Sequence, residues 1–407
     1  MIKNIINLNK AFFAFLLVTF LLVGCIEEFT PETKDYDSIL VVDAVLTDEY
    51  KYQKIKLSRT FKFEEDGAKS EEGATISISD NLNNEYSFSE LESGEYVSDV
   101  AFKAENLEYV LYVKTANGKE YKSTVTILST GSEIDNVSGK ITTNSNQEQG
   151  VSIVVDVKEA SGEVKYYRYE YEETHKIIAP WFNKRKAIIV SEEPPEIKIE
   201  NFNDETGKVC YSTKESNSLI IGSTEGLSGG QLVNFPVRFI DRNDYKILNR
   251  YTILVKQYII SREAHTFYKT LEDFSSSESL FSQIQPGFLK GNIESVNDKN
   301  EKVIGFFEVS SVSSKRIFFE YKDIFTDKPS NAKYPFSCSF IAPTDERKVI
   351  EILKNNSYTW ITDEPELCTN EFCPYGEIEE GPNVYVRVAC GDCSVFSSSI
   401  VPDFWED

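Results

Sequence analysis

Histidine is almost absent from this sequence of 407 residues, which contains only His175 and His265. Ninety positions separate the two, which excludes the His-Glu-x-x-His zinc motif and leaves any Ser-His-Asp triad dependent on an isolated histidine. The sequence also lacks a Gly-x-Ser-x-Gly elbow, a Walker loop and a dinucleotide-binding fingerprint. We therefore predict a protein that is not an enzyme, with no catalytic residue, no cofactor and no metal.

Basic residues are also scarce, because 43 Lys and Arg stand against 66 Asp and Glu, for a net charge of −23. Nucleic-acid affinity comes mainly from Lys and Arg that neutralise phosphates, so nucleic acid is excluded as a partner. The many carboxylates guarantee acid pairs at a glycosidase separation somewhere on the surface. Pairs such as Glu172-Glu173 are therefore interpreted as parts of a solvated acidic face.

Long apolar runs are missing except at the start, where residues 11–23 follow Lys3 and Lys10. This run is shorter than the roughly 20 residues of a helix that crosses a bilayer, and it is typical of a signal peptide. It ends in Leu22-Val23-Gly24-Cys25, which resembles the bacterial lipobox. We expect residues 1–24 to be removed and Cys25 to carry two or more acyl chains, enough for a stable membrane anchor.

Residues 25–37 are predicted to form an acidic tether behind that lipid. Glu27 and Glu28 resemble, in shortened form, the acidic export signal of Bacteroidota lipoproteins. The alternative is a solvated linker without a targeting role. We expect a protein anchored in the outer membrane by lipid and facing the cell exterior.

Residues 38–128 show the period-two alternation of half-buried strands. Leu40, Val42, Ala44 and Leu46 fall on one face, and Asn117-Gly118 predicts a type I′ turn between two later strands. Short strands over about ninety residues are typical of an immunoglobulin-like β-sandwich.

Small residues at 129–132 indicate a boundary, and residues 133–407 are predicted to form a larger β-rich domain. Helix is scarce there: one short amphipathic helix should follow Ser261, and a second should span 345–354 with Thr344 as its cap. The fold class is therefore all-β, mostly antiparallel, with one or two short helices in the second domain.

Six of the seven cysteines remain once Cys25 is assigned to lipid. Export favours disulfides, and Cys368, Cys373, Cys390 and Cys393 lie close enough in sequence to be cross-linked together. That assignment leaves Cys210 and Cys338 as a possible further pair. The alternative is a four-thiolate zinc site, which the spacing of the four clustered cysteines also permits.

Trp181 and Phe182 stand together in what the sequence predicts to be a loop. An exposed pair of this kind could anchor a protein partner or stack on a sugar ring. The alternative is that both rings pack in the β-core.

A series of short segments, taken in order, resembles the Bacteroidota lipoproteins of domain-of-unknown-function family 4249. The segments are Cys25-Ile26-Glu27, Leu40-Val41-Val42-Asp43, Leu46-Thr47-Asp48, Leu57-Ser58-Arg59-Thr60, Gly73-Ala74, Tyr166-Tyr167-Arg168, Glu172-Glu173-Thr174, Ser261-Arg262-Glu263-Ala264, Gly291-Asn292-Ile293, Cys390-Gly391-Asp392-Cys393 and Pro402-Asp403-Phe404-Trp405. The sequence departs from the family pattern at Tyr211, where Trp is expected, and at His265, where Tyr is expected.

The resemblance implies an outer-membrane lipoprotein that is often associated with TonB-dependent transporters. We therefore expect a non-catalytic accessory or ligand-capture partner of such a transporter. Two alternatives stay open: a surface hydrolase acting on glycan or peptide through carboxylates, and a structural or adhesion protein of the envelope.

Overall fold

The computed structural model describes residues 38–61, 65, 67–158, 162–276, 289–327, 333–363 and 381–407. The predicted signal peptide, Cys25, Glu27, Glu28, Cys368 and Cys373 lie outside these residues. The all-β, mostly antiparallel fold class is confirmed. Within the described ranges, no helix combines the length and the apolar character that crossing a bilayer requires.

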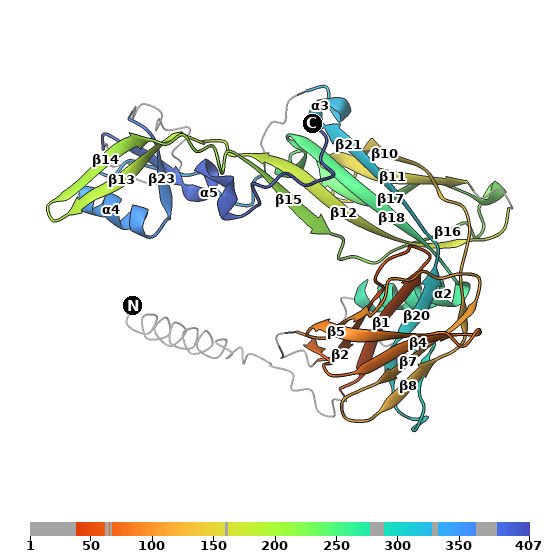
Figure 1. The fold of residues 1–407 in the computed structure, drawn as a ribbon. Helices are drawn as coiled ribbons and strands as arrows, with labels where there is room; N and C mark the ends of the chain where they lie inside the picture. Colours follow the sequence, from red (N-terminus) through yellow and green to blue (C-terminus); the bar gives the residue numbers. More distant parts are fainter. Residues whose placement is uncertain are drawn as a thin grey trace, which may run out of the picture.

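Three units, which we call the first, central and distal units, make up the described chain (Figure 1). The first unit is one sheet of eleven strands in the order β19-β8-β7-β4-β5-β6-β2-β1-β20, with β3 beside β2 and β9 beside β7. Its strands are β1 (Leu40–Thr47), β2 (Lys54–Arg59), β3 (Lys69–Ser70), β4 (Thr75–Asp80), β5 (Glu85–Glu92), β6 (Glu95–Ser98), β7 (Glu108–Lys114), β8 (Glu120–Ser123), β9 (Thr126–Ile127), β19 (Ile293–Ser295) and β20 (Val303–Ser310).

The two ends of this sheet meet, so that one sheet folds over a single core. Asn292, just before β19, accepts a hydrogen bond from the Phe307 backbone N–H at 2.7 Å and donates one to the Phe307 carbonyl at 2.9 Å. The core side of β1 carries Leu40, Val42, Ala44 and Leu46, all at most 2% exposed, as the alternation predicts. The turn at Asn117-Gly118 differs from the prediction, because only Gly118 has a positive φ, of 85°, whereas a type I′ turn needs two.

The predicted boundary at residue 128 does not contain the whole first unit. Strands β19 and β20 come from the part of the sequence assigned to the second domain, and β20 pairs with β1 in parallel from Leu40↔Val303 to Thr47↔Ser310. A parallel pair between segments so far apart in sequence needs a long crossover connection, which leaves no local pattern in either strand.

The central unit is a sandwich of two sheets around one apolar core. One sheet has the order β10-β11-β17, and the other has the order β15-β12-β18-β21 with β16 beside β12. Its elements are β10 (Ile134–Thr143), β11 (Gln149–Lys158), β12 (Tyr166–Ile178), β15 (Val209–Glu215), β16 (Ile220–Ser223), η1 (Ser228–Gly230), β17 (Gln231–Asp241), η2 (Tyr245–Ile247), β18 (Arg250–Ile260), α2 (Arg262–Ser276), β21 (Val312–Glu320) and α3 (Tyr321–Ile324).

Helix α2 confirms the predicted helix, and the Ser261 hydroxyl caps it by accepting the Ala264 backbone N–H at 3.0 Å. Its apolar face packs between the first and central units, where Ala264 and Phe267 share an apolar cluster with Tyr258 and Phe306. The helix therefore helps to fix the position of the first unit against the central one.

The distal unit contains a two-stranded hairpin, a three-stranded sheet in the order β22-β24-β23, and short helices. Its elements are β13 (Arg185–Glu192), β14 (Pro195–Asn201), β22 (Phe340–Ile341), α4 (Glu346–Lys354), β23 (Tyr358–Thr362), β24 (Val384–Arg387), α5 (Val388–Gly391) and η4 (Cys393–Val395). Helix α4 confirms the second predicted helix but corrects its cap, since Asp345 rather than Thr344 accepts the Arg347 N–H. In the sequence the hairpin lies between β12 and β15 of the central sheet, so the distal unit is connected directly to that sheet (Figure 1).

Candidate binding cleft between the first and central units

The junction of the first and central units is built on the outer face of β1 and β20. Leu40 and its alternating partners point to the core, so Asp43 and Thr47 of β1 and Glu308 of β20 point the other way. The central unit covers part of this face, and Thr47 and Glu308 are consequently only 2% and 1% exposed. Polar groups on a strand face that would otherwise be solvated are thus placed inside the molecule.

Arg168 of β12 is the cation that meets this buried face. Its Nη2 lies 3.3 Å from Glu308 Oε1, and Nη1 contacts Glu170. The guanidinium also lies over aromatic rings, 4.3 Å from the centroid of Tyr258 and 5.6 Å from that of Tyr268. Burial alone would lower the pKa of Arg168, but Glu308 and the other neighbours hold it well above its usual range. Arg168 is therefore a permanent charge that ties the two units together.

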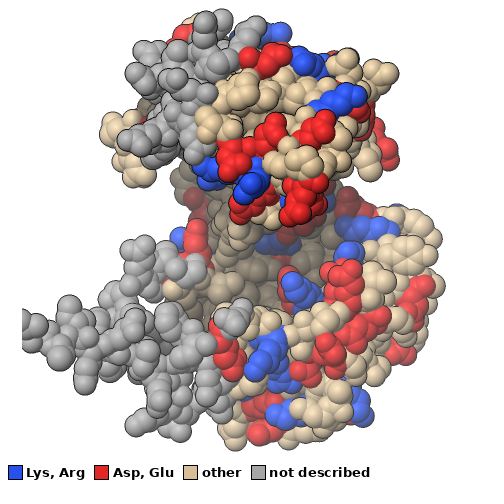
Figure 2. Space-filling model, turned by 90° about the vertical axis from the view of Figure 1, so that its left-hand side faces the viewer, with Lys and Arg blue, Asp and Glu red and all other residues tan. Residues whose placement is uncertain are grey.

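Beside this pair the two units leave a cleft of about 410 Å³. The central unit contributes Glu170, Lys256 and Tyr258, and the first unit contributes Asp43 together with residues 51–56. Figure 2, which views the molecule from the side of the distal unit, shows a hollow between this upper part and the first unit below, with acidic and basic side chains around it. A cleft of this volume at a domain junction falls in the range of small-ligand sites.

Asp43 is open to solvent but stands within the cleft, between the two walls. Crowding by protein raises the pKa of its carboxyl group, and Glu170 and Glu308 act in the same direction, whereas Arg168 and Lys56 lower it. Glu170 is different, because Arg168 and the Tyr258 hydroxyl, which donates at 2.9 Å, occupy its two oxygens. Asp43, unlike Glu170, is thus available to a bound molecule.

A second group of charges, centred on buried Glu173, lies inside the central unit and stabilises its fold. Glu173 is 3% exposed and receives Arg238 Nε at 2.9 Å, Lys246 Nζ at 2.9 Å and the Tyr251 hydroxyl at 2.8 Å. Burial would raise the pKa of Glu173, but the bonds from Arg238 and Lys246 lower it to about 2. Glu172-Glu173 is therefore not simply a solvated acidic face, because its second member is a buried, fully bonded anion.

The two histidines take no part in the cleft. His175 is completely buried, and neither ring nitrogen has a hydrogen-bond partner. Burial, helped by the charge of Lys246, lowers the pKa of His175 to about 4 although Glu173 opposes the shift. His265 lies on α2 with its ring centroid 4.8 Å from that of Tyr166. Both positions are accounted for by packing.

Trp181 and Phe182 are each half-buried in the distal unit. Trp181 packs edge-on against Phe340, with ring centroids 4.9 Å apart, and its backbone N–H donates to the Cys390 carbonyl at 3.0 Å. Phe182 packs beside Cys210 and Cys393. These contacts favour the core-packing alternative and leave only part of each ring for a partner.

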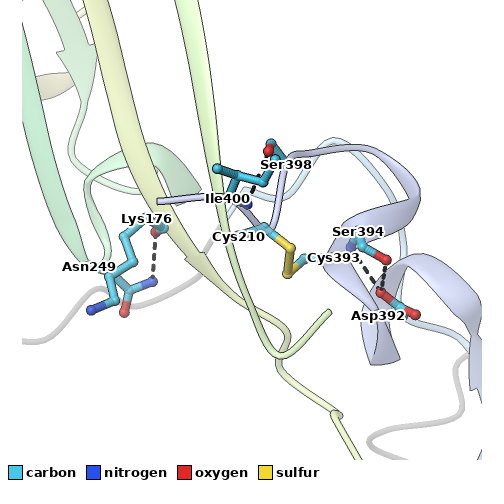
Figure 3. The surroundings of a disulfide bond; sticks show 8 residues. All are labelled: Lys176, Cys210, Asn249, Asp392, Cys393, Ser394, Ser398 and Ile400. Carbon is cyan, nitrogen blue, oxygen red and sulfur yellow. Dashed lines mark hydrogen bonds between the residues drawn. A yellow bond between two sulfur atoms is a disulfide. The ribbon is translucent and has the colours of Figure 1, made fainter. Parts of the chain in front are cut away.

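The cysteine pairing differs from the predicted one. Cys210 of β15 is bonded to Cys393 of η4, and Cys338 is bonded to Cys390 of α5. The Cys210–Cys338 pair is therefore wrong, and Cys390 and Cys393 are not cross-linked within the C-terminal cluster. The reason is that β15 leads directly from the distal hairpin, which brings Cys210 beside the end of the chain (Figure 3).

The four-thiolate zinc alternative loses two of its ligands to these bonds. Cys390 and Cys393 are each half of a disulfide with a different strand or loop, so neither is a thiolate. In the part of the chain that the structure describes, no three His, Cys, Asp or Glu side chains gather to hold a metal ion.

The sequence did not reveal the cleft, although three of the family-like segments contain residues that line it, namely Asp43, Thr47 and Arg168. Arg168 ends Tyr166-Tyr167-Arg168 in the buried first part of β12, and a buried arginine requires a partner. Asp43 ends Leu40-Val41-Val42-Asp43 on the strand face away from the core. The partner of Arg168 is Glu308, which is 140 positions further along the chain, and no local pattern connects them.

Comparisons with known proteins give one family and, among solved structures, remote likenesses. A DUF4785 family protein from Legionella pneumophila subsp. pneumophila str. Philadelphia 1 matches with 12% identity and a TM-score of 0.16, over 54% of this chain and 52% of that one. This chain therefore spans about half the length of that structure. The BSP domain of a biofilm associated protein matches with 10% identity and a TM-score of 0.11, over 72% of this chain and 62% of that one. Scores this low carry no argument about fold or function.

Among curated proteins, none matches this sequence. The model of the family described as "Domain of unknown function (DUF4249)" matches residues 26–316. That range contains both walls of the cleft and ends within β21, before most of the distal unit. The chain therefore belongs to the DUF4249 family.

Proposed function

We propose that this protein is a Bacteroidota lipoprotein, anchored in the outer membrane through lipid on Cys25 and facing the cell exterior, where it captures a ligand for a TonB-dependent transporter without catalysing a reaction. The cleft between the first and central units carries the proposal, because its volume and its open polar groups suit reversible binding. Support for the location comes from Leu22-Val23-Gly24-Cys25 and from two disulfides, which are typical of exported proteins.

Co-purification tests the partner. The protein would be extracted from its own membranes in mild detergent and isolated through a tag after Asp407, with a Cys25→Ala variant as the unlipidated control. We expect the wild type to bring a TonB-dependent transporter with it, and the control to bring much less because it is not held at the membrane. Lipidated protein that is repeatedly isolated without any outer-membrane transporter contradicts the proposal.

Surface display is tested separately on intact cells. Added protease should degrade the wild type, whereas replacement of Glu27 and Glu28 by alanine should protect the protein by retaining it inside. A periplasmic protein serves as the control for cell integrity. If wild type and variant are equally protected, the protein faces the periplasm instead.

A surface hydrolase is the second candidate, and Asp43 is the observation that favours it. Its carboxyl has a raised pKa and stands in a cleft beside Glu170, which is the kind of setting that general acids use. The purified protein would be incubated with peptides and glycans, with Asp43→Asn as the matched variant. Turnover by the wild type that disappears in Asp43→Asn would establish the hydrolase and remove the non-catalytic proposal.

A further inference from the structure

The basic side chains that line the cleft are not equivalent. Five of them line it, and three are engaged: Lys51 Nζ lies 2.5 Å from Glu49, Lys54 Nζ lies 2.7 Å from Glu95, and Arg168 contacts Glu170 and Glu308. Lys56 and Lys256 form no ion pair with any residue that the structure describes. Two ammonium groups in this one cleft are therefore without an ion-pair partner among the described residues.

These two lysines come from opposite walls. Lys56 belongs to β2 of the first unit, and Lys256 belongs to β18 of the central unit. Each stands directly across from an acid on the neighbouring strand, Lys56 from Asp43 and Lys256 from Glu170, yet neither acid bonds to its lysine. Because its walls come from both units, the cleft exists only when the two units are docked. Lys56 attracts Asp43 electrostatically, as the pKa of Asp43 shows, but forms no ion pair with it.

Two carboxylates in the cleft are free as well. Asp43 and Glu215 form no ion pair among the described residues, in contrast to Glu95 and Glu170, which are bound to Lys54 and Arg168. The free groups are therefore balanced, with two anions and two cations. An anionic ligand would be repelled by the two carboxylates, and a cationic ligand would be repelled by the two lysines. A neutral glycan would leave all four charges without an opposite charge.

We infer that the cleft binds a short peptide with free ends, its carboxylate held by Lys56 and Lys256 and its ammonium group by Asp43 and Glu215. This inference rests on the proposed ligand-capture function and names its ligand. The ring of Tyr52, 60% exposed at the edge of the cleft, offers a surface for a peptide side chain. Glu170 is held by Arg168 and Tyr258 and so shapes the wall without competing for the ligand.

The test uses the full mature chain in detergent and two pools of random tetrapeptides. One pool has free ends, and the other is acetylated at the amino end and amidated at the carboxyl end. Binding is measured by equilibrium dialysis with mass spectrometry, and maltotetraose serves as a neutral sugar probe. We expect the free pool to bind at least about tenfold more tightly than the blocked pool, because blocking removes both end charges and the loss of one charge-assisted pair alone has an effect of that size.

Variants locate the binding. Lys56→Met and Lys256→Met keep the length of the side chain and remove its charge, and each should weaken binding of the free pool by about tenfold. Lys122→Met is the matched control, because Lys122 lies on β8 outside the cleft lining and should bind as the wild type does. Lys56 is exposed and Lys256 is half-buried without a partner, so neither substitution should impair folding.

Several results would overturn the inference. Equal binding of the free and blocked pools would show that the ends are not recognised, and unchanged binding in both lysine variants would place the ligand elsewhere. Binding of maltotetraose alone would keep the cleft as a site but replace the peptide by a glycan. Absence of binding to any probe would remove the peptide inference while the transporter co-purification still stands, so the two failures are distinguishable.

Discussion

Replacing His175 by leucine is expected to remove much of the acid sensitivity of the central unit. The side chain is completely buried, and its pKa falls from 6.5 to about 4 because burial and Lys246 oppose the charged form. An unfolded chain takes up this proton near pH 6.5, so between pH 6.5 and 4 the unfolded state binds more protons than the folded one. The free energy of unfolding therefore falls as the pH falls through this window and is fully retained above it.

The size of the effect follows from the shift. A change of about 2.5 pH units at about 1.4 kcal/mol per unit gives about 3 kcal/mol between pH 7 and pH 4. Leucine cannot be protonated, and it displaces two ring nitrogens that have no hydrogen-bond partner. We therefore expect the variant to be about as stable as the wild type at pH 7 and more stable than it below pH 5.

Urea unfolding of both proteins at intervals from pH 7.5 to 4, followed by circular dichroism and tryptophan fluorescence, measures the difference. The contributions of all other groups are common to the two proteins and cancel in the comparison. A difference that stays constant over this range would refute the reasoning, since it would mean that His175 is not the group whose protonation destabilises the fold.

Three other substitutions test separate parts of the structure. Replacing both Cys210 and Cys393 by alanine removes the covalent link between β15 and η4 and should lower the free energy of unfolding by about 2–4 kcal/mol. The segments between the central and distal units should then be cut by limited proteolysis, and unchanged protease resistance would contradict this. Glu173→Gln removes the buried anion of two half-buried basic side chains, so the free energy of unfolding measured in urea at pH 7 should fall by about 3–5 kcal/mol. In the wild type, the stability that Glu173 provides should be lost only as the pH falls from 4.5 towards 2. Gly291→Ala would place a Cβ 1.6 Å from the Gly305 carbonyl oxygen, which would push β19 away from β20. The free energy of unfolding should fall by about 1–3 kcal/mol, and the melting temperature with it. An unaltered melting temperature would show that this close contact is not required.

Much of the secondary structure was predictable because its signals are local. The alternation at Leu40, Val42, Ala44 and Leu46 identified a strand and its core face, and the Ser261 cap identified the start of α2. Cap chemistry was less decisive where two capping residues are adjacent, as at Thr344 and Asp345. The turn at Gly118 was located correctly, but its type depends on the φ of Asn117, which the sequence does not determine.

The pairings between distant segments could not be predicted, and they build the candidate site. The cleft requires β20 beside β1 and Arg168 beside Glu308, and neither contact has a local pattern. The disulfide connectivity could not be predicted for the same reason. Proximity in sequence favoured cross-links within the C-terminal cluster, whereas the fold brings Cys210 to Cys393 across a separation of 183 residues. In the sequence, Gly291-Asn292-Ile293 stands out only by its resemblance to the family, whereas the structure shows that this segment joins the two ends of the first sheet.

The parallel pairing of β1 and β20 has a mechanical consequence. The chain enters β1 at Leu40 from the amino-terminal side, and it leaves β20 at Ser310 into the central unit. A pull between the amino-terminal end and the central unit therefore drags these two neighbouring strands in opposite directions along their length. All the bonds from Leu40↔Val303 to Thr47↔Ser310 are then loaded together in shear, instead of opening one after another as in a peeled hairpin. If the proposed lipid on Cys25 anchors the chain, a load between that anchor and the central unit is borne by this shear geometry.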